Sequence, residues 1–274
     1  LKNIVIIVVL IELVAAVGIA AYETAPHEVQ KEELSIIAKV NIEGSGIFIK
    51  AGDDTEYFEK VGSSYDYTKP IREAWGGKVF GTPGAITIQH LQLMSLAASM
   101  DLKFEKYNPS VAKNKDTLYF VDNITTATAA VSNKSIIDGG YAWEPQFQMI
   151  INNEHTVDGE IVFKTLAFSG DLFPGHSCCV IGVRDAYATS HPQETVNFLA
   201  AYIEAVGFIN DAVKHPLGED YALMVEILKK NFEGLSDDDI QGALKNVVYA
   251  FSDDNTTASL DNLIIELAGI VGNL

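Results

Sequence analysis

The sequence is poor in positive charge, and arginine is its scarcest basic residue. The 274 residues include 19 lysines and arginines against 37 aspartates and glutamates, which gives a formal net charge of −18. Only two positions, Arg72 and Arg184, are arginine. Because no basic stripe could displace counterions from phosphates, the composition argues against a nucleic-acid-binding function. It also confines any guanidinium clamp on an anionic ligand to these two positions.

Cysteine is almost absent as well. The only two cysteines, Cys178 and Cys179, are adjacent, so a bond between them would close a small strained ring and could not staple the fold. On a regular strand the two thiols point to opposite faces. We expect them to act as small buried hydrophobic residues. The alternative, a metal site with His176 and His191, lacks the Cys-x-x-Cys spacing of such sites, so we predict no metal and no cofactor.

The motifs of nucleophilic and nucleotide-dependent enzymes are also missing. No Gly-x-Ser-x-Gly elbow is present, and Gly44-Ser45-Gly46 lacks the remaining glycines of a dinucleotide or phosphate-binding loop. The run Asp237–Asp239 is explained better by acids at a helix N-terminus than by a metal cluster. We therefore predict no catalytic residues and a protein that is not an enzyme.

An apolar run near the N-terminus is broken by a single charge. Residues 4–22 contain Glu12 as their one charged side chain, and their length suits a signal-peptide core or a short membrane anchor. A buried core helix is the alternative, but the run has no polar face. We assign 1–22 to a signal peptide or membrane anchor and the polar stretch 23–33 to a linker. The folded part is then expected on the extracytoplasmic face of the cell membrane, or secreted or periplasmic if the leader is cleaved.

A glycine turn between an apolar strand and a helix is the most informative stretch of the chain. The strand end Val79–Gly81 runs into Thr82-Pro83-Gly84, and a helix opens with Thr87 and Gln89 in its first turn. Such a turn aims unpaired N–H groups and the positive end of a helix dipole at one point. It predicts a seat for an anion or a polar group, with an ordinary strand-to-helix connection as the alternative.

Strands and helices alternate along the chain. Residues 34–50 indicate two strands or one strand with a glycine break, and 53–70 indicate a polar surface loop with a short helix at 56–61. Strands are then expected at 78–80, 102–107 or 118–121, 136–143, 159–167 and 176–184. Helices are expected at 87–100, 123–132, 144–151, 221–232 and 259–271. Two more helices are expected to begin at His191-Pro192 and at the capping box Ser236-x-x-Asp239. In the helix 87–100 we place Leu91, Met94, Leu96 and Ala98 on the core side. The order predicts an α/β fold with parallel or mixed sheets flanked by helices.

An aromatic residue and a carboxylate follow one of these strands. Ligands of parallel sheets lie outside the carboxyl ends of the strands, and Trp143-Glu144-Pro145 stands at such an end. A small-ligand pocket uses residues of this kind. A plain strand-to-helix boundary would account for the proline, yet has less need of a tryptophan. We therefore expect Thr82, Thr87, Gln89, Trp143 and Glu144 on one rim.

Four motifs in a fixed order carry a family resemblance. They are residues 77–84 with Thr87 and Gln89, the stretch 137–145 (IDGGYAWEP), the stretch 175–180 (GHSCCV), and His191-Pro192 opening a helix. Together with 40–46 (VNIEGSG), they resemble the solute-binding proteins of nitrate/sulfonate/taurine-type ABC transporters over residues 36–215. The resemblance implies a two-lobed fold of the periplasmic-binding-protein type (type II), with a ligand cleft between the lobes that closes on binding.

The resemblance also implies partners, a domain layout and a site. The partners are a small anionic solute, an ABC permease and its ATPase, and the membrane through the N-terminal helix. The layout is 34–70 as a remnant of the first lobe and the crossover, 71–158 as the second lobe, and 159–274 as the return to the first lobe with the C-terminal helices; the family's first-lobe strands upstream of 40–46 are missing, so that lobe is expected to be incomplete. The implied ligand-binding residues are Ser45 and Gly46 on the first-lobe wall and Thr82, Thr87, Gln89, Trp143 and Glu144 on the second.

Two further interpretations are open. One is an enzyme or precursor-binding protein similar to the thiamine-pyrimidine synthases, which share a two-lobed fold but use a cysteine motif longer than Cys178-Cys179. The other is a degenerate remnant that binds nothing, because a lobe without its first strands would lose ligand contacts and expose apolar edges.

Overall fold

A computed structural model describes residues 34–152 and 162–250. The predicted N-terminal segment 1–22, the linker 23–33 and the predicted helix 259–271 lie outside the described residues. Within the described residues the chain forms two compact units. Unit 1 holds 34–42, 177–235 and 249–250, and unit 2 holds 43–176 and 236–248 apart from the undescribed stretch.

Unit 2 is built on a six-stranded sheet in the order β6-β7-β5-β8-β2-β9. The strands are β2 (Ser45–Lys50), β5 (Val79–Gly81), β6 (Lys103–Lys106), β7 (Thr117–Val121), β8 (Gly139–Trp143) and β9 (Phe163–Phe168). β5 pairs in parallel with β7 and β8, and β6 with β7, whereas β2 runs antiparallel to both β8 and β9. The carboxyl ends of β5, β7, β8 and β9 therefore meet the amino end of β2 at one edge.

A continuous apolar run in β2 explains why this strand lies inside the sheet. Ile47 and Ile49 belong to a core cluster with Leu93, Trp75 and Phe80. Phe48 faces the other way and packs edge-on against Phe163 of β9, with ring centroids 4.9 Å apart. A strand covered on both faces is apolar in its interior, as Ile47, Phe48 and Ile49 of β2 are. The range expected for the second lobe, 71–158, leaves out β2 and β9, which the structure places in this sheet.

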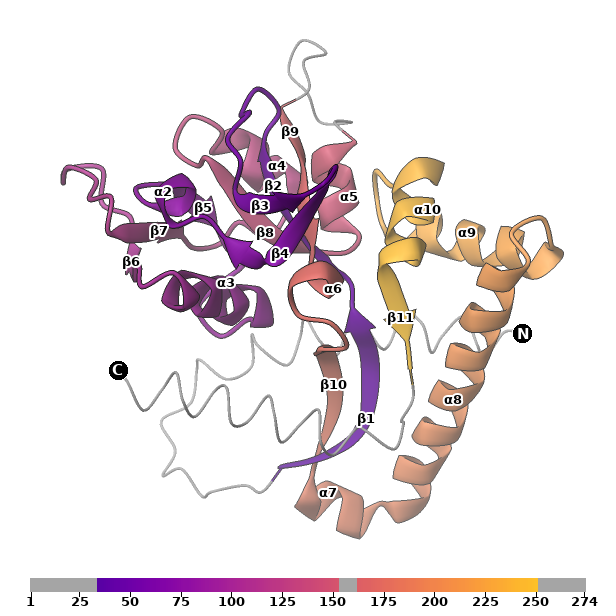
Figure 1. Ribbon diagram of the computed structural model, residues 1–274. Coiled ribbons are helices and arrows are strands. Elements are labelled where there is room, and N and C mark those ends of the chain that lie inside the picture. The colour runs from indigo at the N-terminus through magenta and orange to yellow at the C-terminus, as the bar shows by residue number, and fades with distance from the viewer. Residues whose placement is uncertain (1–33, 153–161, 251–274) are drawn as a thin grey trace. The chain divides into compact units, whose positions relative to one another are not determined.

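Helices cover unit 2 on both faces of the sheet (Figure 1). They are α2 (Arg72–Trp75), α3 (Ile88–Ser99), α4 (Ala127–Ser132), α5 (Gln146–Ile151), α6 (Ser169–Leu172) and α10 (Asp237–Asn246). α5 packs on β2, β8 and β9 and also contacts α4 and α10, whereas α3 packs on β6 and β8. The C-terminal helix α10 therefore belongs to a unit formed mostly by the middle of the chain.

The expected loop at 53–70 is a hairpin instead. β3 (Phe58–Val61) pairs antiparallel with β4 (Ser64–Pro70), and Gly62 supplies a positive φ of 67° in the turn. The expected short helix at 56–61 is wrong because Tyr57 and Phe58 are fully buried against Trp75. The packing of these two rings against the core accounts for a hairpin in a stretch whose polar composition predicted a loop.

Unit 1 combines a small sheet with two long helices. β1 (Leu34–Glu43) pairs antiparallel with β10 (Ser177–Arg184), and β11 (Val247–Tyr249) completes the order β10-β1-β11. α7 (Asp185–Ser190) leads into α8 (Pro192–Lys214), and α9 (Glu219–Asn231) follows. Ala38 of β1 packs on Tyr202 and Val206 of α8, and the Tyr202 hydroxyl donates to the Lys39 carbonyl at 2.8 Å.

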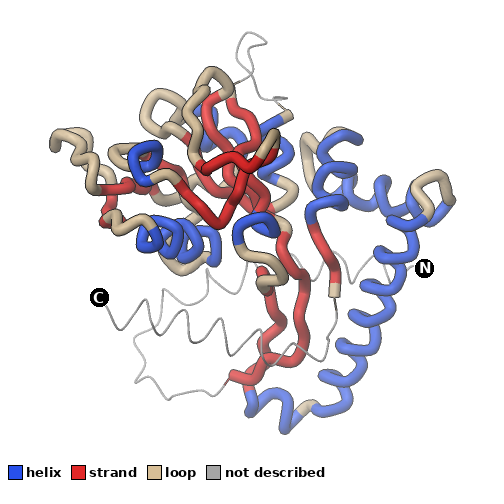
Figure 2. The backbone as a smooth tube through the Cα atoms, in the orientation of Figure 1, coloured by secondary structure: helices blue, strands red, loops and turns tan. Residues whose placement is uncertain are grey.

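The helix α8 is the longest continuous helix in Figure 2. Among the described helices it is the one with the length and apolar composition to cross a membrane, a test that core helices of soluble proteins also pass. Taken together, the mixed sheet flanked by helices confirms the predicted α/β fold class.

Candidate functional site

The site residues expected from the sequence gather at the carboxyl edge of the unit 2 sheet. Ser45, the first residue of β2, is paired with Trp143, the last residue of β8, and Gly46 lies opposite Ala142 and Phe168. Thr82 directly follows β5. The expectation that Ser45 and Gly46 lie on a different lobe from Thr82 is wrong. Because β2 runs against its neighbours, its first residues lie where the other strands end.

Ser45 is the centre of a buried group of hydrogen bonds. Its hydroxyl accepts a hydrogen bond from Gln89 Nε2 at 2.8 Å, and its N–H donates to Ser169 Oγ at 3.2 Å. Ser45 and Ser169 are fully buried and Gln89 is 2% exposed. Buried polar groups of this kind are stable only when they are paired. Gln89 of α3 is thus fixed against the first residue of β2.

The glycine turn after β5 is held by local bonds. Thr87 is the N-cap of α3: its Oγ1 accepts from the His90 N–H at 3.4 Å and donates to the Gly84 carbonyl at 2.7 Å. Thr82 is fully buried, with Oγ1 3.0 Å from His90 Nδ1. The His90 ring lies edge-on against Phe104 and Phe120, and burial lowers the pKa of His90. Thr82 therefore holds the turn, whereas Thr87 stays half-buried at its surface.

Glu144 lies in a second set of hydrogen bonds, which α10 completes. Its Oε1 accepts from Asn246 Nδ2 at 2.6 Å and from Gln148 Nε2 at 3.0 Å, and its Oε2 accepts from the Gln148 N–H at 3.3 Å. Asn246 Nδ2 also donates to the Ser45 carbonyl at 3.2 Å. Gln89, Ser45, Asn246, Glu144 and Gln148 thus form one connected group, which we call the carboxyl-edge network.

Burial raises the pKa of Glu144 from its ordinary 4.5 to about 7. The hydrogen bonds from Asn246 and Gln148 oppose this rise, and the charge of Asp239 adds to it. A carboxyl group with this pKa exists in both forms near neutral pH. It can therefore accept a hydrogen bond from a ligand or, when protonated, donate one to an oxyanion.

We expect Glu144 to make stability fall as pH rises. Below pH 4.5 the carboxyl group is protonated in both the folded and the unfolded state. Between pH 4.5 and about 7 it loses its proton in the unfolded state but keeps it in the folded state, which stabilises the unfolded state and lowers the free energy of unfolding. The loss between pH 4.5 and 8 is up to about 3 kcal/mol. Urea unfolding at pH 5 and pH 8 measures this loss. In Glu144→Gln the part of the pH dependence of the free energy of unfolding that Glu144 causes should vanish. Equal slopes in both proteins would contradict the assignment.

Gly46 and Trp143 complete the expected set. A Cβ at Gly46 would lie 2.4–2.7 Å from the Phe147 ring, so Gly46 serves close packing of α5 on β2. Trp143 is half-buried at the rim. The structure therefore brings Ser45, Gly46, Gln89, Trp143 and Glu144 together through strand pairing and hydrogen bonds, and places Thr82 and Thr87 in the adjacent turn. Sequence reasoning missed Asn246 and Gln148, for which no local motif gives a signal.

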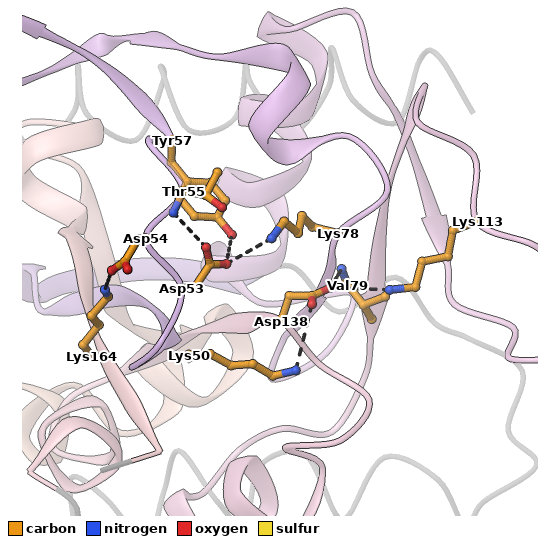
Figure 3. A network of polar contacts seen from close by, with 10 residues as sticks. All are labelled: Lys50, Asp53, Asp54, Thr55, Tyr57, Lys78, Val79, Lys113, Asp138 and Lys164. Atoms are coloured by element: carbon orange, nitrogen blue, oxygen red, sulfur yellow. Dashed lines mark hydrogen bonds and ion pairs between the residues drawn. The ribbon is translucent and has the colours of Figure 1, made fainter.

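A shallow depression of about 740 Å³ lies at the opposite edge of the sheet. Its lining residues are Lys50, Ala51, Gly52, Asp53, Asp54, Lys134, Ser135 and Val162. Figure 3 shows that carboxylates at this edge bond to lysines and backbone: Asp53, which lines the depression, accepts from Lys78 at 3.0 Å, and Asp138 accepts from the Val79 N–H at 2.9 Å. Burial alone would raise the pKa of Asp53, but hydrogen bonds from Thr55, Lys78 and Tyr57 outweigh it and lower that pKa. Asp53 and Asp138 thus have structural partners within the chain, so we place the candidate site at the carboxyl edge.

The described residues define the class of protein: an α/β protein with polar residues gathered at the carboxyl edge of its larger sheet. The sequence matches the model of the NMT1-like family over residues 11–217. The chain belongs to this family, and the resemblance indicated by the four motifs is confirmed. No curated protein matches the sequence.

Solved structures with similar folds agree with this class. A ligand-binding component of an ABC-type import system from Staphylococcus aureus, determined with zinc bound, has a TM-score of 0.60 at 16% identity, with 88% of this chain and 68% of that chain covered. The periplasmic nitrate-binding protein NrtA from Synechocystis PCC 6803 has a TM-score of 0.50 at 18% identity, with 82% of this chain and 51% of that chain covered. The periplasmic aliphatic sulphonate-binding protein SsuA from Escherichia coli has a TM-score of 0.54 at 14% identity, with 88% of this chain and 65% of that chain covered. The chain thus spans between 51% and 68% of these proteins, and the similarity establishes the fold.

Proposed function

We propose that this protein is the extracytoplasmic solute-binding component of an ABC importer for a small anionic solute such as nitrate, a sulfonate or taurine. Family membership and the fold support the general role, since two of the similar structures are described as nitrate- and sulphonate-binding proteins. In this proposal residues 1–22 hold the protein at the membrane or direct its export. The partners are an ABC permease and its ATPase.

One observation carries the proposal: the N-terminus of α3 and the ends of β2 and β8 converge on a single edge through Ser45 and Gln89. The N–H groups of the first turn of a helix favour an anion. Gln89 and Thr87 hold the N-terminus of α3 at that edge through their hydrogen bonds to Ser45 and Gly84. Trp143 supplies a half-buried ring there, and the protonated form of Glu144 supplies a donor. Binding then needs only differential affinity and no bond chemistry.

A thermal-shift screen of the full chain tests the role. Nitrate, alkane sulfonates and taurine are expected to raise the melting temperature, while pyrimidine precursors should not. A shift with pyrimidine precursors accompanied by turnover would overturn the transporter role in favour of an enzyme. A poorly cooperative melt with no shift for any of these solutes would indicate a remnant that binds nothing.

We expect Gln89→Leu to weaken binding of the solute found in that screen about 10-fold, because the change removes the buried hydrogen bond that fixes the N-terminus of α3 at Ser45, and such a bond is worth about 1.4 kcal/mol. Gln193→Leu is the matched control, since Gln193 is exposed on α8 and bonds only to Asn197. Calorimetric titration at equal folded fractions gives both affinities. Equal weakening in the two variants would contradict the placement of the site.

A further inference from the structure

The adjacent cysteines do not point to opposite faces of β10, as regular alternation would require. Ile42 of β1 is paired with Ser177, and the next residue back, Asn41, is paired with Cys179. The register shifts by one residue here, and Cys178 is the extra residue of a β-bulge. A bulge changes the direction of the side chain that it carries, and here it turns Cys178 toward Cys179.

The result is a close pair of thiols at the surface of unit 1. Cys179 Sγ donates to Cys178 Sγ at 3.8 Å, Cys179 is exposed and Cys178 is half-buried. The expectation that both cysteines are buried hydrophobic residues is therefore wrong. The hydrogen bond with Cys178 and burial both raise the pKa of Cys179.

The separation of the sulfur atoms suits chelation better than a disulfide. Two thiolates bound to one tetrahedral ion at about 2.3 Å each lie about 3.8 Å apart, and the sulfur atoms are 3.8 Å apart in the protein. A disulfide would need about 2.05 Å between sulfurs and Cα atoms at least about 4.4 Å apart, whereas neighbouring Cα atoms across a trans peptide are about 3.8 Å apart.

We propose that Cys178 and Cys179 form a vicinal dithiolate site for a soft divalent d¹⁰ cation of the zinc and cadmium type. Two S–H bonds break, two sulfur–metal bonds form from the sulfur lone pairs, and both protons pass to solvent, with no change of oxidation state. In the described part of the chain no group of three or more His, Cys, Asp or Glu side chains is placed to hold an ion. Water or a small exogenous ligand therefore fills the remaining positions, and the ion stays accessible.

Cadmium titration of the full, reduced chain tests the site, with the ultraviolet sulfur-to-cadmium charge-transfer band as the readout. We expect one ion per chain and a loss of affinity of at least 10-fold in both Cys178→Ser and Cys179→Ser. His191→Gln, a change in an exposed histidine of the same unit, should keep the wild-type affinity. Absence of the band, or unchanged affinity in either serine variant, would overturn the proposal.

A second measurement on the wild-type chain does not depend on how the variants fold. Cadmium is expected to protect both thiols from alkylation to the same extent, as read by mass spectrometry. Protection of only one thiol would show that the pair does not chelate. An ion shared by two chains, detected as a cadmium-dependent dimer with half an ion per chain, would also overturn the intramolecular site.

Discussion

Trp75→Ala is expected to lower the free energy of unfolding by about 3–5 kcal/mol, because the change leaves a cavity at the centre of the unit 2 core. Trp75 is fully buried, stacks on Phe80 with ring centroids 5.0 Å apart, and meets Tyr57 and Phe58 edge-on. Its Nε1 donates to the Tyr57 carbonyl at 3.0 Å, so the variant also removes one of the two donors to that carbonyl, which keeps the Ile71 N–H at 2.9 Å.

Trp143→Ala is the matched control for this experiment, since Trp143 is the other tryptophan of the chain and is only half-buried. We expect it to cost less than half as much, and urea unfolding followed by far-ultraviolet circular dichroism measures both. If the two variants lose the same free energy, the assignment of Trp75 as the core anchor of unit 2 is wrong.

Asp239→Ala is expected to cost about 2–4 kcal/mol, because three donors lose a fully buried charged acceptor. The carboxylate accepts from Ser236 Oγ at 2.7 Å, from the Ser236 N–H at 3.1 Å and from Asn152 Nδ2 at 2.8 Å. It thereby caps α10 and ties this helix to the end of α5.

The neighbouring Asp238 is exposed, so Asp238→Ala serves as the control and should change stability by less than about 0.5 kcal/mol. A second readout separates loss of the cap from general unfolding. Removal of the Asp239 charge should lower the pKa of Glu144, as followed by NMR titration of its side chain. An unchanged Glu144 pKa in a folded Asp239→Ala protein would show that the charge of Asp239 does not act on Glu144.

Features decided by neighbours in the sequence were predictable. The capping box of Ser236 and Asp239 is confirmed by reciprocal hydrogen bonds, and Thr87 caps α3 as its place in the first turn suggested. The break between β1 and β2 falls at Gly44, whose φ of 88° suits glycine. Capping and positive φ depend on three or four residues, which a sequence displays directly.

Features decided by distant partners were not predictable. In α3 the buried apolar side chains are Leu93, Leu96 and Ala97, whereas Ala98 is exposed, so the predicted core face is only partly right. The buried face also carries polar residues: Gln92 accepts from the Tyr141 hydroxyl at 2.7 Å, a contact between residues 49 positions apart. A pattern that counts apolar residues cannot assign glutamines to a core when their partners lie on another strand.

The candidate site shows the same limit. Strand order placed Thr82, Trp143 and Glu144 at one edge, because carboxyl ends of parallel strands always meet. The antiparallel direction of β2 and the docking of Asn246 depend on pairing across 98 and 201 positions, respectively. Contacts between residues so far apart in the sequence become visible only in the folded structure.

The return of α10 to unit 2 has a consequence for synthesis on the ribosome. All six strands of the larger sheet lie before residue 169, and so that sheet can assemble while the rest of unit 1 is still being translated. Asn246, the partner of Glu144, is made 102 residues after it. A nascent chain would therefore carry a formed sheet without Asn246 at its carboxyl edge until α10 emerges, so the completed carboxyl-edge network marks a chain whose translation has passed α10.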